Sequence, residues 1–181
     1  MPATAVLAVF RAVRTLSLPA ALAAGLSAVA GDHARAEAPP IGRTYVVMMT
    51  QPQIASGHVR HLLPPLTDAL DRAGLKNGKG PSAEWVVTVE TSADPGAWLG
   101  KGESRRWRHN STVSVGFARN EGFPRKPDIQ TFTVDARVVT ANPDRPDEYR
   151  CLVDLAVKTA MKRWQPKGRI AVQGVECERG E

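Results

Sequence analysis

The sequence has few of the residues that carry out chemistry, and it lacks the common motifs that arrange them. Four histidines and two cysteines are spread over 181 residues, with no G-x-S-x-G elbow and no C-x-x-C pair. The glycine-rich stretch at residues 74–80 departs from the phosphate-binding pattern, because only three residues separate its first two glycines and Lys79 is followed by Gly80. The sequence therefore contains no common hydrolase or nucleotide-binding motif, and we expect no cofactor.

The N-terminal segment has no acidic residue before Asp32. Arg11 and Arg14 precede residues 15–30, which carry no charge and form a run shorter than the ~20 apolar residues of a membrane-spanning helix. A basic end followed by a short apolar run predicts a secretory signal peptide. The alternative is an uncleaved membrane anchor.

Three positions within this segment have the small residues that a signal peptidase requires: Ala30, Ala36 and Ala38. A cut after Ala38 would leave Pro39 beside the cleaved bond, and a cut after Ala30 would leave almost no polar stretch before it. We expect cleavage after Ala36. No cysteine lies nearby to be lipidated, so we expect a released, periplasmic or secreted product.

Cleavage would leave 145 residues, a common size for one domain. It would lower the formal net charge from +6 to +4, because three basic residues and one acidic residue would be lost. So small an excess does not predict nucleic-acid binding. The abundance of Arg, Ala, Pro and Gly is typical of a GC-rich bacterium, so the periplasm is the expected compartment.

The two cysteines, Cys151 and Cys177, both lie in the expected mature chain. An even number of cysteines in an exported protein favours a disulfide, here closing a loop of 26 positions. Two unbonded buried thiols are the alternative. The spacing matches neither a redox pair nor a zinc site, so the expected role is structural.

Hydrophobic periodicity predicts a small two-layer α+β domain. We expect residues 37–43 to form a lead-in and residues 44–181 a single domain with the order β-α-β-β-β-α, with or without a final strand. Short segments that alternate between apolar and polar residues and are joined by turns favour a mostly antiparallel sheet of four to five strands with two helices on one face. The expected strands are residues 44–50, 84–91, 106–119 and 129–140, with a final strand at 169–175, and the expected helices are residues 64–73 and 147–164.

One candidate metal site combines His58 and His61 with Met48 and Met49, since thioethers and imidazoles suit copper and imidazole also suits zinc. The histidines would share a face only if the segment before Pro64 were helical, and prolines inside a helix disfavour that. Core methionines and surface histidines are the favoured interpretation.

A second candidate is the basic, aromatic segment at residues 101–109. Arg105, Arg106 and Arg108 with Trp107 are residue types that hold anionic polymers, phosphates or lipid headgroups. In a strand, Arg106 and Arg108 would share a solvated face, and Arg105 and Trp107 the other, with the indole buried. The alternative is a charged strand edge that prevents aggregation.

These observations favour an exported, non-enzymatic binding or accessory domain for a cell-envelope component or a protein partner. The expected partner is an anionic envelope component or another periplasmic protein; no nucleic acid is expected, and no membrane span in the mature form. Two alternatives remain: a small periplasmic hydrolase whose site assembles from distant residues, and a periplasmic protein that handles copper or zinc.

Overall fold

The computed structural model describes residues 38–49, 54–55, 57–121 and 131–178. The predicted signal peptide and its cleavage site lie outside these residues. None of the described helices is both long and apolar enough to cross a membrane.

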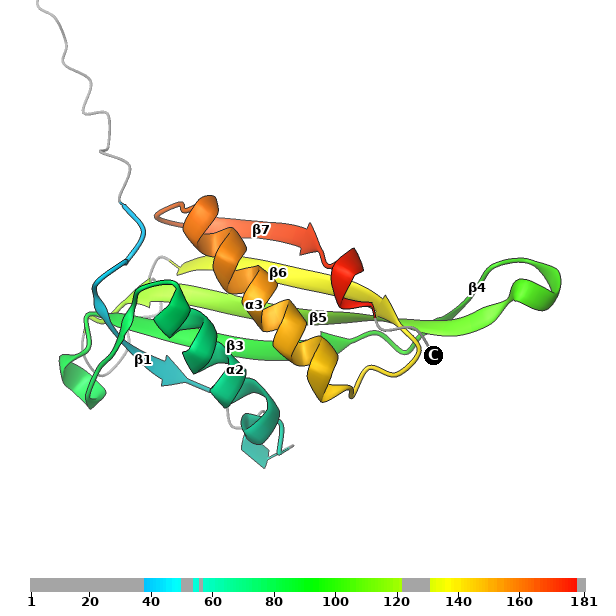
Figure 1. The fold of residues 1–181 in the computed structure, drawn as a ribbon, viewed down its shortest axis with the longest axis horizontal. Helices are drawn as coiled ribbons and strands as arrows, with labels where there is room; N and C mark the ends of the chain where they lie inside the picture. The colour runs from blue at the N-terminus through cyan, green and yellow to red at the C-terminus, as the bar shows by residue number, and fades with distance from the viewer. Residues whose placement is uncertain (1–37, 50–53, 56, 122–130, 179–181) are drawn as a thin grey trace, which may run out of the picture. The chain divides into compact units, whose positions relative to one another are not determined.

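The described chain forms one mixed sheet with two main helices (Figure 1). The strands follow the order β2-β1-β3-β5-β6-β7, and β4 pairs only with β5. The strands are β1 (Thr44–Met48), β2 (Lys76–Asn77), β3 (Trp85–Ala93), β4 (Ala97–Leu99), β5 (Arg106–Arg119), β6 (Thr131–Thr140) and β7 (Gly168–Gln173). The helices are α2 (Val59–Arg72) and α3 (Pro146–Lys162).

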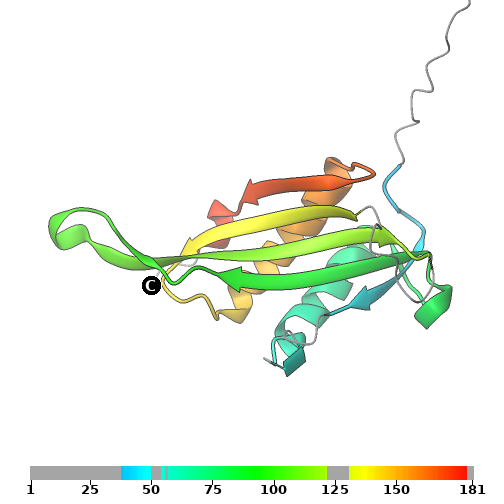
Figure 2. The same ribbon diagram turned by 180° about the vertical axis from the view of Figure 1, so that it is seen from behind.

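Both helices lie on the same face of the sheet, so the small two-layer α+β domain is confirmed (Figure 1). The core forms between the layers because β3, β5 and β6 present every second side chain to the helices. Val87 of β3 lies opposite Phe117 of β5, which in turn lies opposite Phe132 of β6, and all three side chains are buried. Seen from behind, the other face of the sheet has no described helix over it (Figure 2).

The direction of the strands differs from the expected antiparallel arrangement. The hairpin partners β3, β5 and β6 are antiparallel, but β1 runs parallel to β3, and β6 runs parallel to β7. The reason is the position of the helices, since a chain that crosses back through a helix enters the next strand in the same direction. The sheet also has more strands than the four to five expected.

The start of α2 was also predicted wrongly. The helix begins at Val59, five residues before Pro64, and carries Pro64 and Pro65 in its interior. Proline has no N–H to donate, so two bonds of the helical ladder are absent. The buried side chains of Leu62 and Leu66 hold this part of the helix against the sheet, and packing of that kind outweighs local propensity.

A disulfide joins Cys151 of α3 to Cys177, which lies in the short 3-10 turn after β7. This is the pairing expected from the cysteine count. Cys177 is fully buried, and its bond fixes the C-terminal segment to the helix layer.

Candidate binding arm

The β4–β5 hairpin extends past the rest of the sheet, and both views show it projecting beyond the ends of the neighbouring strands (Figures 1 and 2). We call residues 97–108 the arm. Its end is a short 3-10 turn at Gly102–Ser104. Every residue from Ala97 to Trp107 is exposed, and Arg108 at the base of the arm is partly buried.

The base of the arm is held by Asp94, where the chain leaves β3. The Asp94 carboxylate accepts hydrogen bonds from the backbone N–H of Gly96 at 3.0 Å and of Asn110 at 2.9 Å. The Asn110 side-chain amide donates to the other carboxylate oxygen. These bonds favour the charged carboxylate, the Asn110 side chain contributing most, and so they lower the pKa of Asp94.

Two tryptophans face each other across the arm. Trp98 and Trp107 are direct cross-strand partners, and their rings meet edge to face with centroids 5.5 Å apart. The exposed fraction is 54% for Trp98 and 41% for Trp107. The expectation of a buried Trp107 indole was therefore wrong, because this end of β5 lies beyond the helices and has no core beneath it.

The cations of the arm lie on both faces of the ribbon. The guanidinium of Arg105 lies 5.3 Å from the Trp98 ring centroid, on the tryptophan face. Arg106 pairs across the ribbon with Leu99, and Arg108 with Ala97, so these two arginines have the opposite face. The predicted division of the arginines between two faces is thus present.

Sequence reasoning missed Trp98 and Leu99. The signal for them is symmetry about a turn, because Trp98 and Trp107 lie equally far from the centre of the segment that reverses the chain. Gly100 and Gly102 in that segment both adopt positive φ, at 91° and 53°. A tryptophan on each side of such a turn predicts a cross-strand pair.

His58 contacts one residue of β3 and one of α3. Its Nδ1 lies 3.3 Å from Oγ1 of Thr91, and its ring centroid lies 5.9 Å from that of Tyr149. Because α2 starts early, His58 and His61 do lie about one helical turn apart, contrary to the expectation from the prolines. Among the described residues, however, no three histidine, cysteine or acidic side chains gather closely enough to hold a metal ion.

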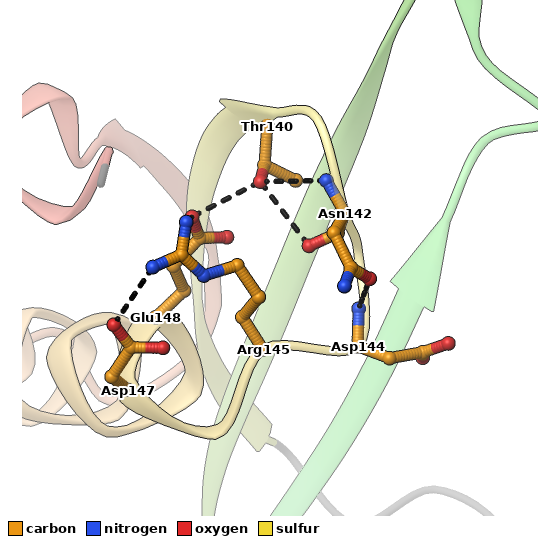
Figure 3. Close-up of polar contacts among 6 residues, drawn as sticks. All are labelled: Thr140, Asn142, Asp144, Arg145, Asp147 and Glu148. Atoms are coloured by element: carbon orange, nitrogen blue, oxygen red, sulfur yellow. Dashed lines mark hydrogen bonds and ion pairs between the residues drawn. The ribbon is translucent and has the colours of Figure 1, made fainter. Parts of the chain in front are cut away.

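The first turn of α3 contains a buried carboxylate, Glu148, which faces the end of β6 (Figure 3). The Thr140 hydroxyl donates to Oε1 of Glu148 at 3.0 Å, and an Arg145 nitrogen lies 3.7 Å from the same oxygen. Asn142 adds a backbone N–H to the Thr140 hydroxyl and accepts from the N–H of Asp144. These contacts fasten the start of α3 to the end of β6, and they give Glu148 a structural role.

The surface of the described residues also contains shallow cavities, three of which lie at the base of the arm, between the helices and beside the lead-in. The largest, about 530 Å³, lies at the base of the arm between Asp94, Asn110 and Arg137. A groove of about 460 Å³ follows Arg72, Asp154 and Lys158 between the helices. A third, of about 230 Å³, lies beside the lead-in. None of the three is lined by His58 or His61.

No protein-family model matches the sequence, and no curated protein matches it either. Among solved structures, the chain is similar to a minor lipoprotein from Acinetobacter baumannii, with 16% sequence identity and a TM-score of 0.41. The match covers 70% of this chain and 98% of that one. A likeness of this size identifies neither a family nor a function for this chain.

Proposed function

We propose that this protein is an exported, non-enzymatic binding domain of the bacterial cell envelope and that the arm is its binding element. In this proposal residues 1–36 are a signal peptide cleaved after Ala36, residues 37–43 are a lead-in, and residues 44–181 are one α+β domain. The mature protein then acts in the periplasm or outside the cell.

The observation that carries the proposal is the exposure of Trp98 and Trp107 on an element that contributes nothing to the core. Large exposed aromatic side chains grouped in one place are typical of interaction surfaces. The two rings and Arg105 also pack on one another, so the surface is ordered before a partner arrives. Ordering of this kind lowers the entropy lost on binding.

Export is supported by the basic-then-apolar N-terminal segment and by the Cys151–Cys177 disulfide. Structural disulfides form in oxidising compartments and are rare in the bacterial cytosol. Native mass spectrometry of the protein recovered from the periplasm should therefore give a chain that begins at Glu37 and is two hydrogens lighter than its reduced form. Recovery of the uncleaved chain in the membrane fraction alone would contradict this part of the proposal.

The arm is tested in the living bacterium by photocrosslinking. A photoreactive amino acid is placed at Leu99 on the arm, and in a matched control at Val175, an exposed apolar residue away from the arm. We expect covalent adducts from position 99 and none from position 175, because only the arm is proposed to hold a partner. Equal labelling at the two positions, or none at either, would exclude the arm as the binding element.

A further inference from the structure

We infer that the arm binds the surface of an anionic lipid membrane, with Trp98, Leu99 and Trp107 entering the headgroup layer. This inference rests on the proposed function and names the partner of the same element. It depends on where the apolar groups lie, on how the indole rings are arranged, and on the charge around them.

The apolar groups lie on both faces of the ribbon. Trp98 and Trp107 occupy one face, and Leu99, which is 48% exposed, points to the other because neighbouring residues in a strand alternate. A protein or glycan groove contacts mainly the side that is laid against it. A lipid interface surrounds a narrow ribbon, so it can cover all three side chains at once.

The indole rings are arranged poorly for stacking. Bases, like the sugars of a glycan, stack on flat ring faces, which must be open. Here one indole turns its edge to the other, and the Arg105 guanidinium lies over the Trp98 ring. An interfacial tryptophan has no such requirement, because the headgroup layer accepts its apolar body and its N–H together.

The charge of the arm favours an anionic surface. Residues 97–108 contain Lys101, Arg105, Arg106 and Arg108 but only one acidic residue, Glu103. Guanidinium groups bind phosphate oxygens through paired hydrogen bonds, and each cation near an anionic membrane adds to its attraction.

The dimensions of the arm also fit the depth to which peripheral proteins enter a lipid interface. Leu99 and Arg106 lie two strand positions nearer the tip than Ala97 and Arg108, a span of roughly 7 Å at the usual rise per residue. Apolar groups of peripheral proteins enter the interface to a depth of about 5–10 Å. Leu99 can therefore enter the interface while Arg108 remains level with the phosphates.

The test is flotation of the exported protein, as recovered from the expressing bacterium, with vesicles of two compositions. One contains phosphatidylethanolamine and phosphatidylglycerol, and the other contains phosphatidylcholine alone. We expect binding to the anionic vesicles that weakens with added salt, and little binding to the neutral ones. Tryptophan emission should shift to shorter wavelength on binding, because Trp98 and Trp107 leave water.

Three arm variants separate the contributions. The W98A/W107A variant should lose at least about ten-fold in affinity, and the L99S variant should lose less. The R106Q/R108Q variant keeps the apolar groups and should lose roughly 30-fold, with a weaker salt dependence. The matched controls V175S and K76Q/K79Q change an exposed apolar residue and two exposed cations outside the arm, and they should bind as the unaltered protein does.

The inference fails if the anionic vesicles do not bind the protein, or if the arm variants bind them as well as the controls. Its failure can be told from failure of the proposed function by the adduct formed at position 99. Adducts with the mass of a protein or glycan, together with no vesicle binding, would overturn the lipid inference and leave the arm as a binding element. Lipid-sized adducts together with arm-dependent flotation are the expected result.

Discussion

The indole of Trp107 lies directly over Gly96, so closely that a Cβ atom on that glycine would come within 2.7 Å of Cε2 of the ring. The glycine also has a φ of 89°, which L side chains rarely adopt. Gly96 therefore links the backbone conformation at the base of the arm to the orientation of the Trp107 indole.

From this contact we predict that the G96A variant turns the Trp107 indole away from the ribbon. Quenching of tryptophan fluorescence by iodide should increase, and vesicle binding should fall, while the midpoint of urea unfolding should fall because alanine is strained at this φ. The matched control is G102A, also at positive φ, where an added Cβ would meet no atom within 4 Å. Equal quenching in the two variants would show that the close contact with the ring does not matter.

The lowered pKa of Asp94 predicts how the base of the arm depends on pH. A carboxyl group whose pKa is lower in the folded protein than its ordinary 3.8 stabilises the fold above that value. This contribution is lost as the pH falls from about 3.8 through the folded-state pKa. NMR titration should therefore show the amide signals of Gly96 and Asn110 constant down to about pH 4 and moving only below it.

The D94N variant should remove this acid transition while leaving the signals of the core residues in place. A midpoint for Asp94 at or above 3.8 would contradict the assignment of its hydrogen bonds.

The buried carboxylate of Glu148 predicts a local loss of stability. The T140A variant removes the hydroxyl that donates to Oε1 and leaves a buried charged group short of a partner, so the free energy of unfolding should fall by about 1–3 kcal/mol. The control is D147N, because Asp147 also pairs with Arg145 but has a side chain that is 52% exposed. That variant should change the free energy of unfolding by at most ~0.5 kcal/mol. If T140A and D147N lowered the free energy of unfolding equally, the burial of Glu148 would not add to the cost of losing a hydrogen-bond partner.

The Cys151–Cys177 disulfide closes a loop of 26 positions and should contribute about 3 kcal/mol to the free energy of unfolding in the chain-entropy model. Urea unfolding with and without a thiol reductant measures this difference. The C151A/C177A variant should match the reduced protein and should no longer respond to the reductant. An unchanged unfolding midpoint after complete reduction would show that the C-terminal segment is held by packing alone.

Periodicity in the sequence predicted the elements well where one face of a strand or helix is buried. The strand at residues 106–119 is predicted with the observed limits, and its Val113, Val115 and Phe117 do share the core face. The apolar residues at helical spacing in α3 are likewise buried, namely Tyr149, Leu152, Val153, Ala156, Val157 and Ala160. In these segments local pattern and tertiary packing agree.

The same patterns could not predict what lies over each face. Alternation places Trp107 opposite to Arg106 and Arg108, but it does not reveal that the helices end before this part of β5. Pro64 and Pro65 remove hydrogen bonds from a helix, so in the sequence they suggest a helix start. The buried leucines of α2 offset this cost, but they do so through contacts with strands that are distant in the sequence. The sequence therefore predicted the candidate site from its arginines and Trp107, whereas Trp98 was placed in it by the pairing of β4 with β5.

A single uninterrupted strand, β5, carries half of the arm at one end and the middle of the core at the other. Beyond the arm it is bonded along its length to β3 on one side and to β6 on the other. A pull on the arm along β5 would therefore load both ladders in shear, where many hydrogen bonds share the force, and would not peel them apart one at a time. The fold can therefore transmit tension from the arm to the rest of the domain.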